Sequence, residues 1–271
     1  MRFQLFIPLT LALAVFAQDQ PAHTPGAGIN FYSLDREIAL GADVAEAVRR
    51  ETKALDSDLA RDYVARLGRQ LALETPGPKF PYTFTVLANL PASMSDNPTH
   101  EPMALPGGPI FIPASLILEA QDTSELAGML AHAIAHVADR DCTRSKTRAD
   151  LMQLGAVADV QSPGCWVGQG AVPLGYLSFQ QAFERQADYL AVQIMAKAGY
   201  DPLAMAAYIR RAQQAPGRQT AISRGFSPWP AAEERIQQID KEIRKLSPDR
   251  RYSVGEDIQP IQLEVRNLAA K

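Results

Sequence analysis

Apolar residues recur at helical spacing near the start of the chain. A first helix is expected over residues 33–50, where Ser33 is a good N-cap and acidic residues follow it. A second should begin at the Asp56-Ser57-Asp58 cap and stop at Pro76-Gly77-Pro78. One face of each helix is apolar: Leu34, Ile38, Ala42, Ala45 and Val48 in the first, and Leu59, Tyr63, Leu67 and Leu71 in the second.

Apolar and polar residues alternate in a shorter region, and this pattern predicts strands. Residues 82–87 are rich in β-formers. Residues 103–105 and 110–112 flank the run Pro106-Gly107-Gly108-Pro109, which predicts a short hairpin or a kinked strand. Residues 258–265 form a weaker strand-like tail. A small sheet is therefore expected.

Helical spacing dominates from residue 115 onward, interrupted by a Gly-rich, irregular stretch over 161–175. No internal repeat or second compositional regime is visible. One mainly helical α+β domain with a small β-sheet is the simplest interpretation. The expected helices cover residues 115–119, 123–140, 143–160, 179–198, 202–213 and 231–246.

Composition narrows the class of protein. The chain has 271 residues, 46% hydrophobic and 21% charged, which is typical of a globular protein. Its formal net charge of −3 gives no electrostatic reason to expect nucleic acid or anionic membrane as a partner.

The first residues have the layout of a secretory signal peptide. Arg2 is followed by an apolar run over 3–16, and Val15-Phe16-Ala17 offers a cleavage site. The alternative, an N-terminal core helix, is disfavoured by Pro8 within the run and by the polar residues that start at Gln18. We therefore expect a signal peptide at 1–17 and a flexible leader at 18–32. The mature chain would be exported to the periplasm or the extracellular space, without a transmembrane span.

Two cysteines, Cys142 and Cys165, fit such a compartment. A disulfide between them would close a loop of roughly 20 residues and contribute about 3 kcal/mol to stability. Two unpaired, partly buried thiols are the alternative, and the sequence does not decide between them.

Candidate chemistry begins with His132 and His136, in the middle of the helix expected at 123–140. Residues at i and i+4 share a helical face, so both imidazoles can reach one metal ion. Such a pair is also found as two hydrogen-bonded core histidines.

A second helix carries Glu184 and Asp188, again at i and i+4. Glu184 could complete a three-ligand site of the catalytic zinc type, and Asp188 could orient a ligand histidine. Glu184 could equally be a surface residue beside Arg185.

Several ordered motifs extend over nearly the whole mature chain: Glu37 with Leu40-Gly41, Tyr63-Val64 with Leu67-Gly68, Ala104-Leu105-Pro106-Gly107-Gly108, Ser124-Glu125-Leu126-Ala127, Glu184 with Ala187-Asp188, Ala198-Gly199-Tyr200-Asp201-Pro202, and Pro230 with Arg235. Together they resemble the motifs of the M48-type zinc metallopeptidases.

The resemblance implies a zincin-like peptidase domain over residues 33–248, followed by a C-terminal tail at 249–271. It implies one Zn²⁺ per chain, held by His132, His136 and Glu184, with Asp188 supporting a ligand. The turn Pro106-Gly107-Gly108 would lie at the edge along which a peptide or unfolded protein binds.

The chain departs from the family pattern His-Glu-x-x-His at its second position, which is Ala133. In the family this Glu is the general base, and such a base contributes about 10²–10⁴-fold to the rate. Trp229 stands where relatives usually have a His that could steady the oxyanion, and Glu101-Pro102-Met103 replaces the usual Asn-Ala-Phe.

Two functions follow as hypotheses. The chain could be a zinc metalloendopeptidase of the cell envelope that acts on misfolded or envelope proteins, with Glu101 or Asp139 as a substitute base. It could instead be an inactive zinc-site protein that binds peptides as a chaperone or assembly factor. Peripheral association with the envelope is compatible with both hypotheses. An engineered inactivation at Ala133 would leave Trp229 unexplained.

Overall fold

The structure is a computed structural model that describes residues 24–89, 101–151, 174–213, 231–247, 250–253 and 255–269. The expected signal peptide at 1–17, Cys165 and Trp229 lie outside these residues. The expected Cys142–Cys165 disulfide and the role of Trp229 therefore stay predictions.

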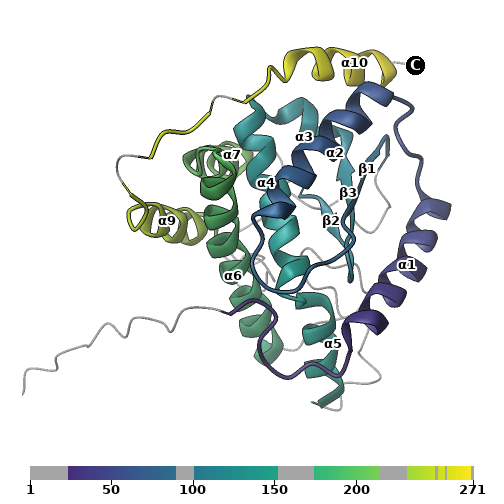
Figure 1. Cartoon of the computed structure of the whole chain (residues 1–271), viewed down its shortest axis with the longest axis vertical. Coiled ribbons are helices and arrows are strands. Elements are labelled where there is room, and N and C mark those ends of the chain that lie inside the picture. Colours follow the sequence, from purple (N-terminus) through teal and green to yellow (C-terminus); the bar gives the residue numbers. More distant parts are fainter. Residues whose placement is uncertain are drawn as a thin grey trace, which may run out of the picture.

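The described elements are mainly helical, with one small sheet, as expected from the periodicity (Figure 1). Their bounds are α1 Leu34–Glu51, α2 Asp58–Leu73, β1 Thr83–Leu87, β2 Met103–Ala104, β3 Pro109–Pro113, α3 Ala114–Glu119, α4 Thr123–Ala138, α5 Asp141–Leu151, α6 Leu174–Ala198, α7 Leu203–Gln213, α9 Ala232–Ile243 and α10 Gln259–Ala269. Within the described ranges, no helix is long and apolar enough to cross a membrane.

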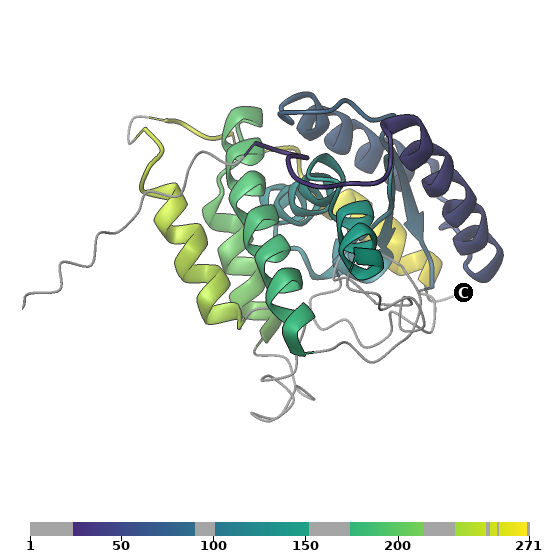
Figure 2. The same ribbon diagram turned by 90° about the horizontal axis from the view of Figure 1, so that it is seen from below.

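The sheet has the order β1-β3-β2. Strand β1 is parallel to β3, with Thr83 opposite Pro109, and β2 is antiparallel to β3, with Ala104 opposite Ile110. The expected hairpin is thus confirmed as the β2–β3 pair. Seen from below, α1 lies on one side of the sheet and most other helices on the other (Figure 2).

Alternation along the strands gives each face of the sheet its own apolar cluster. The α1 face is the smaller one: Ala45, Val48, Leu87, Met103, Leu105 and Phe111. The opposite face belongs to the main core: Phe84, Val86, Ala104, Ile110 and Ile112 join buried residues of α2, α4, α6 and α7.

The turn between β2 and β3 lies against α1. Gly107 has φ 74°, and a Cβ there would stand 2.4 Å from the Cα of Ile38. On the helix side, a Cβ on Gly41 would stand 1.7 Å from the carbonyl oxygen of Pro106. Both positions need glycine because the two backbones are in contact. Helix α1 therefore fixes the place of this turn.

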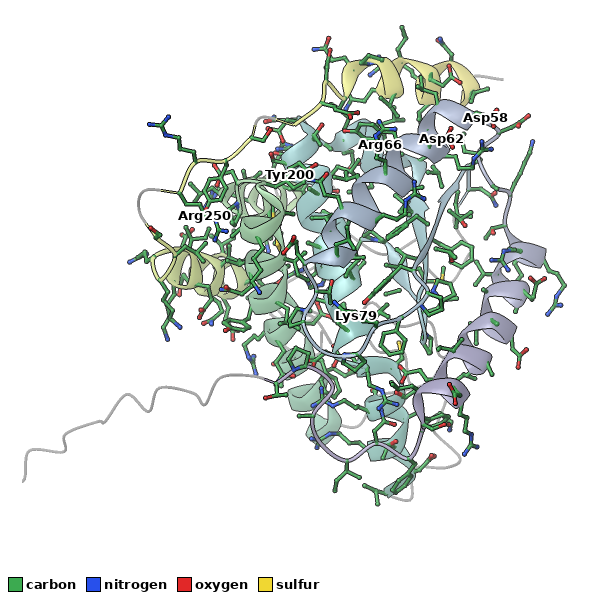
Figure 3. All side chains as sticks on the ribbon, in the orientation of Figure 1. Asp58, Asp62, Arg66, Lys79, Tyr200 and Arg250 are labelled. Carbon is green, nitrogen blue, oxygen red and sulfur yellow. The ribbon has the colours of Figure 1, made fainter. Side chains whose placement is uncertain are left out.

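The expectation of a strand over 258–265 was wrong, because residues 259–265 belong to α10 and Ile258 directly precedes it. Ile258, Ile261 and Val265 are buried, and their spacing follows one helical face. Pro260 is in the first turn, where its missing N–H costs no hydrogen bond. The segment before α10 also contacts α2: Arg66 on α2, labelled in Figure 3, pairs with Glu256 at 2.7 Å.

Candidate metal centre

The candidate residues lie on two helices that pack side by side, α4 and α6 (Figures 1 and 2). Every residue of α4 is buried, and its first turn is capped by Asp122, whose side chain accepts from the Glu125 N–H. Helix α6 begins at Leu174, five residues before the start that we expected at 179. Because α4 is buried along its whole length, its two histidines are shielded from solvent.

The structure brings together three side chains that the sequence singled out. The Nε2 atoms of His132 and His136 are 3.1 Å apart. Glu184 lies between them, with one oxygen 3.4 Å from His132 Nε2 and the other 3.3 Å from His136 Nε2. All three residues are at most 1% exposed. Among the described residues they form the one group of His, Cys, Asp or Glu side chains that could hold a metal ion.

The tautomers of the two histidines leave this group without a proton donor. His132 Nδ1 lies 3.0 Å from Asp188 and His136 Nδ1 lies 2.8 Å from Asp141. A carboxylate only accepts, so the hydrogen bond to Asp141 puts the proton of the neutral His136 ring on Nδ1, and its Nε2 presents a lone pair. For His132 it is the proximity of Asp188 to Nδ1 that favours the same tautomer. Neither oxygen of Glu184 has a hydrogen-bond donor among the described residues. A buried set of lone pairs this close is stable only around a cation or added protons.

The spacing fits zinc. In a tetrahedral site with metal–ligand bonds of about 2.0–2.1 Å, two ligand atoms are about 3.3–3.4 Å apart. The separation of the two Nε2 atoms, 3.1 Å, is close to that value, and each oxygen of Glu184 lies at a similar distance, 3.3 or 3.4 Å, from one of them. Two imidazoles and one carboxylate are also the ligands of a catalytic-type zinc site with an open fourth position.

The pKa directions without a metal agree with a site that attracts positive charge. Burial lowers the pKa of His132, but Asp188 and Glu184 outweigh it and raise that pKa above its usual value. Burial likewise lowers the pKa of His136, and Glu184 with Asp141 raises it well above its usual value. Burial raises the pKa of Glu184, but the two histidines outweigh burial and lower that pKa below its usual value.

A buried arginine fixes the carboxylate behind His132. Arg235 on α9 donates to both oxygens of Asp188, at 2.9 and 2.8 Å, and to Glu101 at 2.7 Å. Burial raises the pKa of Asp188, but Arg235 and His132 outweigh it and lower that pKa. Asp188 thus lies beside His132, and its expected orienting role stays a prediction; the ion pair between Arg235 and Glu101 was not foreseen.

Asp141 is a site residue that the sequence did not reveal. It belongs to α5, and it approaches His136 because a turn at Arg140, whose φ is 60°, separates α5 from α4. Burial raises the pKa of Asp141 to about 6, against the lowering influence of its hydrogen bond to His136. No motif marks a non-glycine residue that will adopt a left-handed conformation, so this contact could not be predicted from the sequence.

The two candidate substitute bases are held by other groups. Glu101 is paired with Arg235 at 2.7 Å. Asp139 accepts from the Gly26 N–H at 2.9 Å and lies 3.4 Å from Arg144. Ala133, one residue after the candidate ligand His132, is 1% exposed and packs in the main core. The turn at 106–108 has its closest contacts with α1 and Pro81, so its role beside a peptide stays a prediction.

Comparison with known proteins gives a family-level match. The sequence model of peptidase family M48 matches residues 62–243, more than half of the chain. A relative in Vibrio cholerae, named a putative beta-barrel assembly-enhancing protease, is 26% identical over 216 residues. The beta-barrel assembly-enhancing protease of Yersinia pestis is 26% identical over 192 residues. The mitochondrial metalloendopeptidase OMA1 of Schizosaccharomyces pombe is 27% identical over 161 residues.

These matches cover 73%, 66% and 58% of this chain, in the same order. They cover 43%, 38% and 48% of the relatives, so the chain spans less than half the length of each.

Proposed function

Because this chain belongs to peptidase family M48, we propose that it is an envelope protein that holds zinc and binds unfolded peptide but hydrolyses it slowly at best. One observation carries the proposal. The metal-type triad of His132, His136 and Glu184 is complete, while Ala133 beside it has no acid–base group.

Zinc, when bound, would act as a Lewis acid on a peptide carbonyl and lower the pKa of water. His132, His136 and Glu184 would hold it, and Asp188 and Asp141 would fix the two rings. What the chain does not supply at position 133 is a carboxylate to take a proton from water and to pass one to the leaving nitrogen. An unprotonated amide nitrogen leaves poorly, so turnover should suffer more than binding.

The acids that could replace the missing base are committed to other partners. Moving Glu101 toward a substrate would leave the buried Arg235 with Asp188 alone. Moving Asp139 would break its contacts with Gly26 and Arg144. Both movements expose or unpair buried charge, which disfavours them.

Placement in the envelope rests on two separate supports. Residues 1–17 have the pattern of a secretory signal peptide. The bacterial relatives are named for enhancing the assembly of β-barrels. Misfolded or unassembled envelope proteins are therefore the proposed ligands.

Ala133→Glu tests the proposal, with Ala133→Gln as the matched control that adds the same bulk without a base. Zinc content, circular dichroism, binding of a labelled unfolded peptide and cleavage of casein would be measured for all three proteins. The unaltered chain and the Gln variant should bind peptide and cleave casein at background. The Glu variant should cleave at least about a hundredfold faster.

Zinc-dependent cleavage by the unaltered chain well above background would show that another residue acts as the base. Failure to bind peptide would remove the binding function. A folded, zinc-loaded Glu variant that stays at background would show that position 133 is not what prevents hydrolysis.

A further inference from the structure

We infer that Asp141, held in place by Arg144, is a positioning residue that fixes His136 for metal binding. The inference rests on the proposed zinc-holding function, and it concerns residues that no motif of the family resemblance includes. It gives His136 a support equivalent to the one that Asp188 and Arg235 give to His132.

The first step is the contact itself. His136 Nδ1 and Asp141 Oδ2 are 2.8 Å apart, and both residues are 1% exposed. The hydrogen bond places the ring proton on Nδ1 and aims Nε2 at Glu184 and His132. A carboxylate in this position also makes the imidazole a stronger electron donor toward a metal.

The second step is how the backbone brings Asp141 there. Five residues further along a continuous helix, a side chain would point about 140° away from His136. Helix α4 instead ends at Ala138, Arg140 takes a φ of 60°, and α5 begins at Asp141. Arg140 is thus in a left-handed conformation, which costs free energy for a non-glycine residue. This conformation turns Asp141 back toward the metal-type triad.

The third step is the support behind Asp141. Arg144, one turn later on α5, lies 3.4 Å from both Asp141 Oδ1 and Asp139 Oδ1 and donates to the Asp139 carbonyl at 3.2 Å. Its guanidinium also lies over the ring of Phe183, 5.0 Å from the centroid. Phe183 directly precedes Glu184, so one buried arginine connects the ends of α4 and α5 to the helix of the third ligand.

The segment before α1 covers this arginine. A Cβ on Gly28 would stand 3.7 Å from Arg144 Nη2, and the Gly26 N–H donates to Asp139 at 2.9 Å. Phe31 donates its backbone N–H to Thr147 on α5 at 3.0 Å. Figure 1 shows this purple segment passing around α5 before it enters α1. Arg144 is left 7% exposed, so its pairing with Asp141 is little screened by solvent.

Zinc affinity measured by chelator competition tests this positioning role, with the absorption spectrum of the Co²⁺-loaded protein as a direct report on ligand geometry. Asp141→Ala removes the support, and Asp141→Asn keeps an oxygen that accepts from Nδ1 but removes the charge. Glu125→Gln is the matched control, because Glu125 is also buried and paired with an arginine, Arg211 at 2.6 Å, yet its side-chain hydrogen bonds in the described part of the chain run to Arg211 and Gln121 and to neither metal-site histidine.

Asp141→Ala should weaken zinc binding about 10–100-fold and change the Co²⁺ spectrum, and Asp141→Asn should lose less. Glu125→Gln should lower stability but leave the zinc Kd and the spectrum unchanged. The isosteric Asn variant carries the test alone if the Ala variant does not fold.

Unchanged affinity and spectrum in the folded Asp141 variants would overturn the inference while leaving the proposed function intact. Equal losses in Glu125→Gln would also overturn it, because the effect would then be general destabilisation. An unaltered chain that binds neither Zn²⁺ nor Co²⁺ would overturn the proposed function, and the inference with it.

Discussion

Replacing Arg235 by Met should be among the most damaging single changes in the described part of the chain. The side chain is 2% exposed and makes three charged hydrogen bonds, two to Asp188 and one to Glu101. Burial lowers the pKa of Arg235, but Asp188 and Glu101 raise it well above its usual value, so the guanidinium is firmly charged.

The expected cost follows from what the change leaves behind. Removing one partner of a buried ion pair costs about 3–5 kcal/mol, because the remaining charge is buried and unpaired. Here two carboxylates would lose their cation, and Asp188 and Glu101 are 1% and 2% exposed. We therefore expect the upper part of that range. Glu101→Gln in the same protein should recover part of the loss, with a coupling of about 0.5–3 kcal/mol.

Urea titration of the zinc-free protein, followed by circular dichroism, measures the free energy of unfolding by linear extrapolation. Arg185→Met is the matched control on the same pair of helices. Arg185 pairs with Glu234 at 3.1 Å, but the two side chains are 38% and 53% exposed. An exposed pair of this kind contributes about 0–1 kcal/mol. If Arg235→Met cost no more than the control, the reasoning from burial would be refuted.

Three further predictions concern the metal, the packing of α1 and export. Elemental analysis should find about one zinc per chain and little in His136→Ala, because that change removes one of three ligands; equal zinc in both proteins would contradict the site. Gly41→Ala should lower the free energy of unfolding by about 1–3 kcal/mol, since the new Cβ would stand 1.7 Å from the Pro106 carbonyl oxygen; an unchanged urea midpoint would disprove this contact. Mass spectrometry of protein from its native host should show a mature N-terminus near Gln18, whereas an intact Met1 terminus would count against export.

Local features of the sequence determined most of the elements and the centre of the site. Helical periodicity located α1, α2, α4, α7 and α9, and alternation located β1 and the β2–β3 hairpin. The i, i+4 spacing of His132 and His136, and of Glu184 and Asp188, places each pair on one helical face in any helix. Where a local pattern was short, as at 258–265, strand and helix could not be told apart, and packing on the core decided for α10.

Tertiary structure alone decided how the site is supported. Arg235 reaches Glu101 across 134 positions of sequence, and Gly26 reaches Asp139 across 113. Asp141 meets His136 only because Arg140 adopts a left-handed conformation that its residue type does not favour. Spacing along one helix fixes the direction of side chains, so it could place two candidate site residues on the same face of each helix. The charged side chains beside the candidate ligands lie on segments that only tertiary packing brings together. Their contacts therefore depend on the stability of the whole fold.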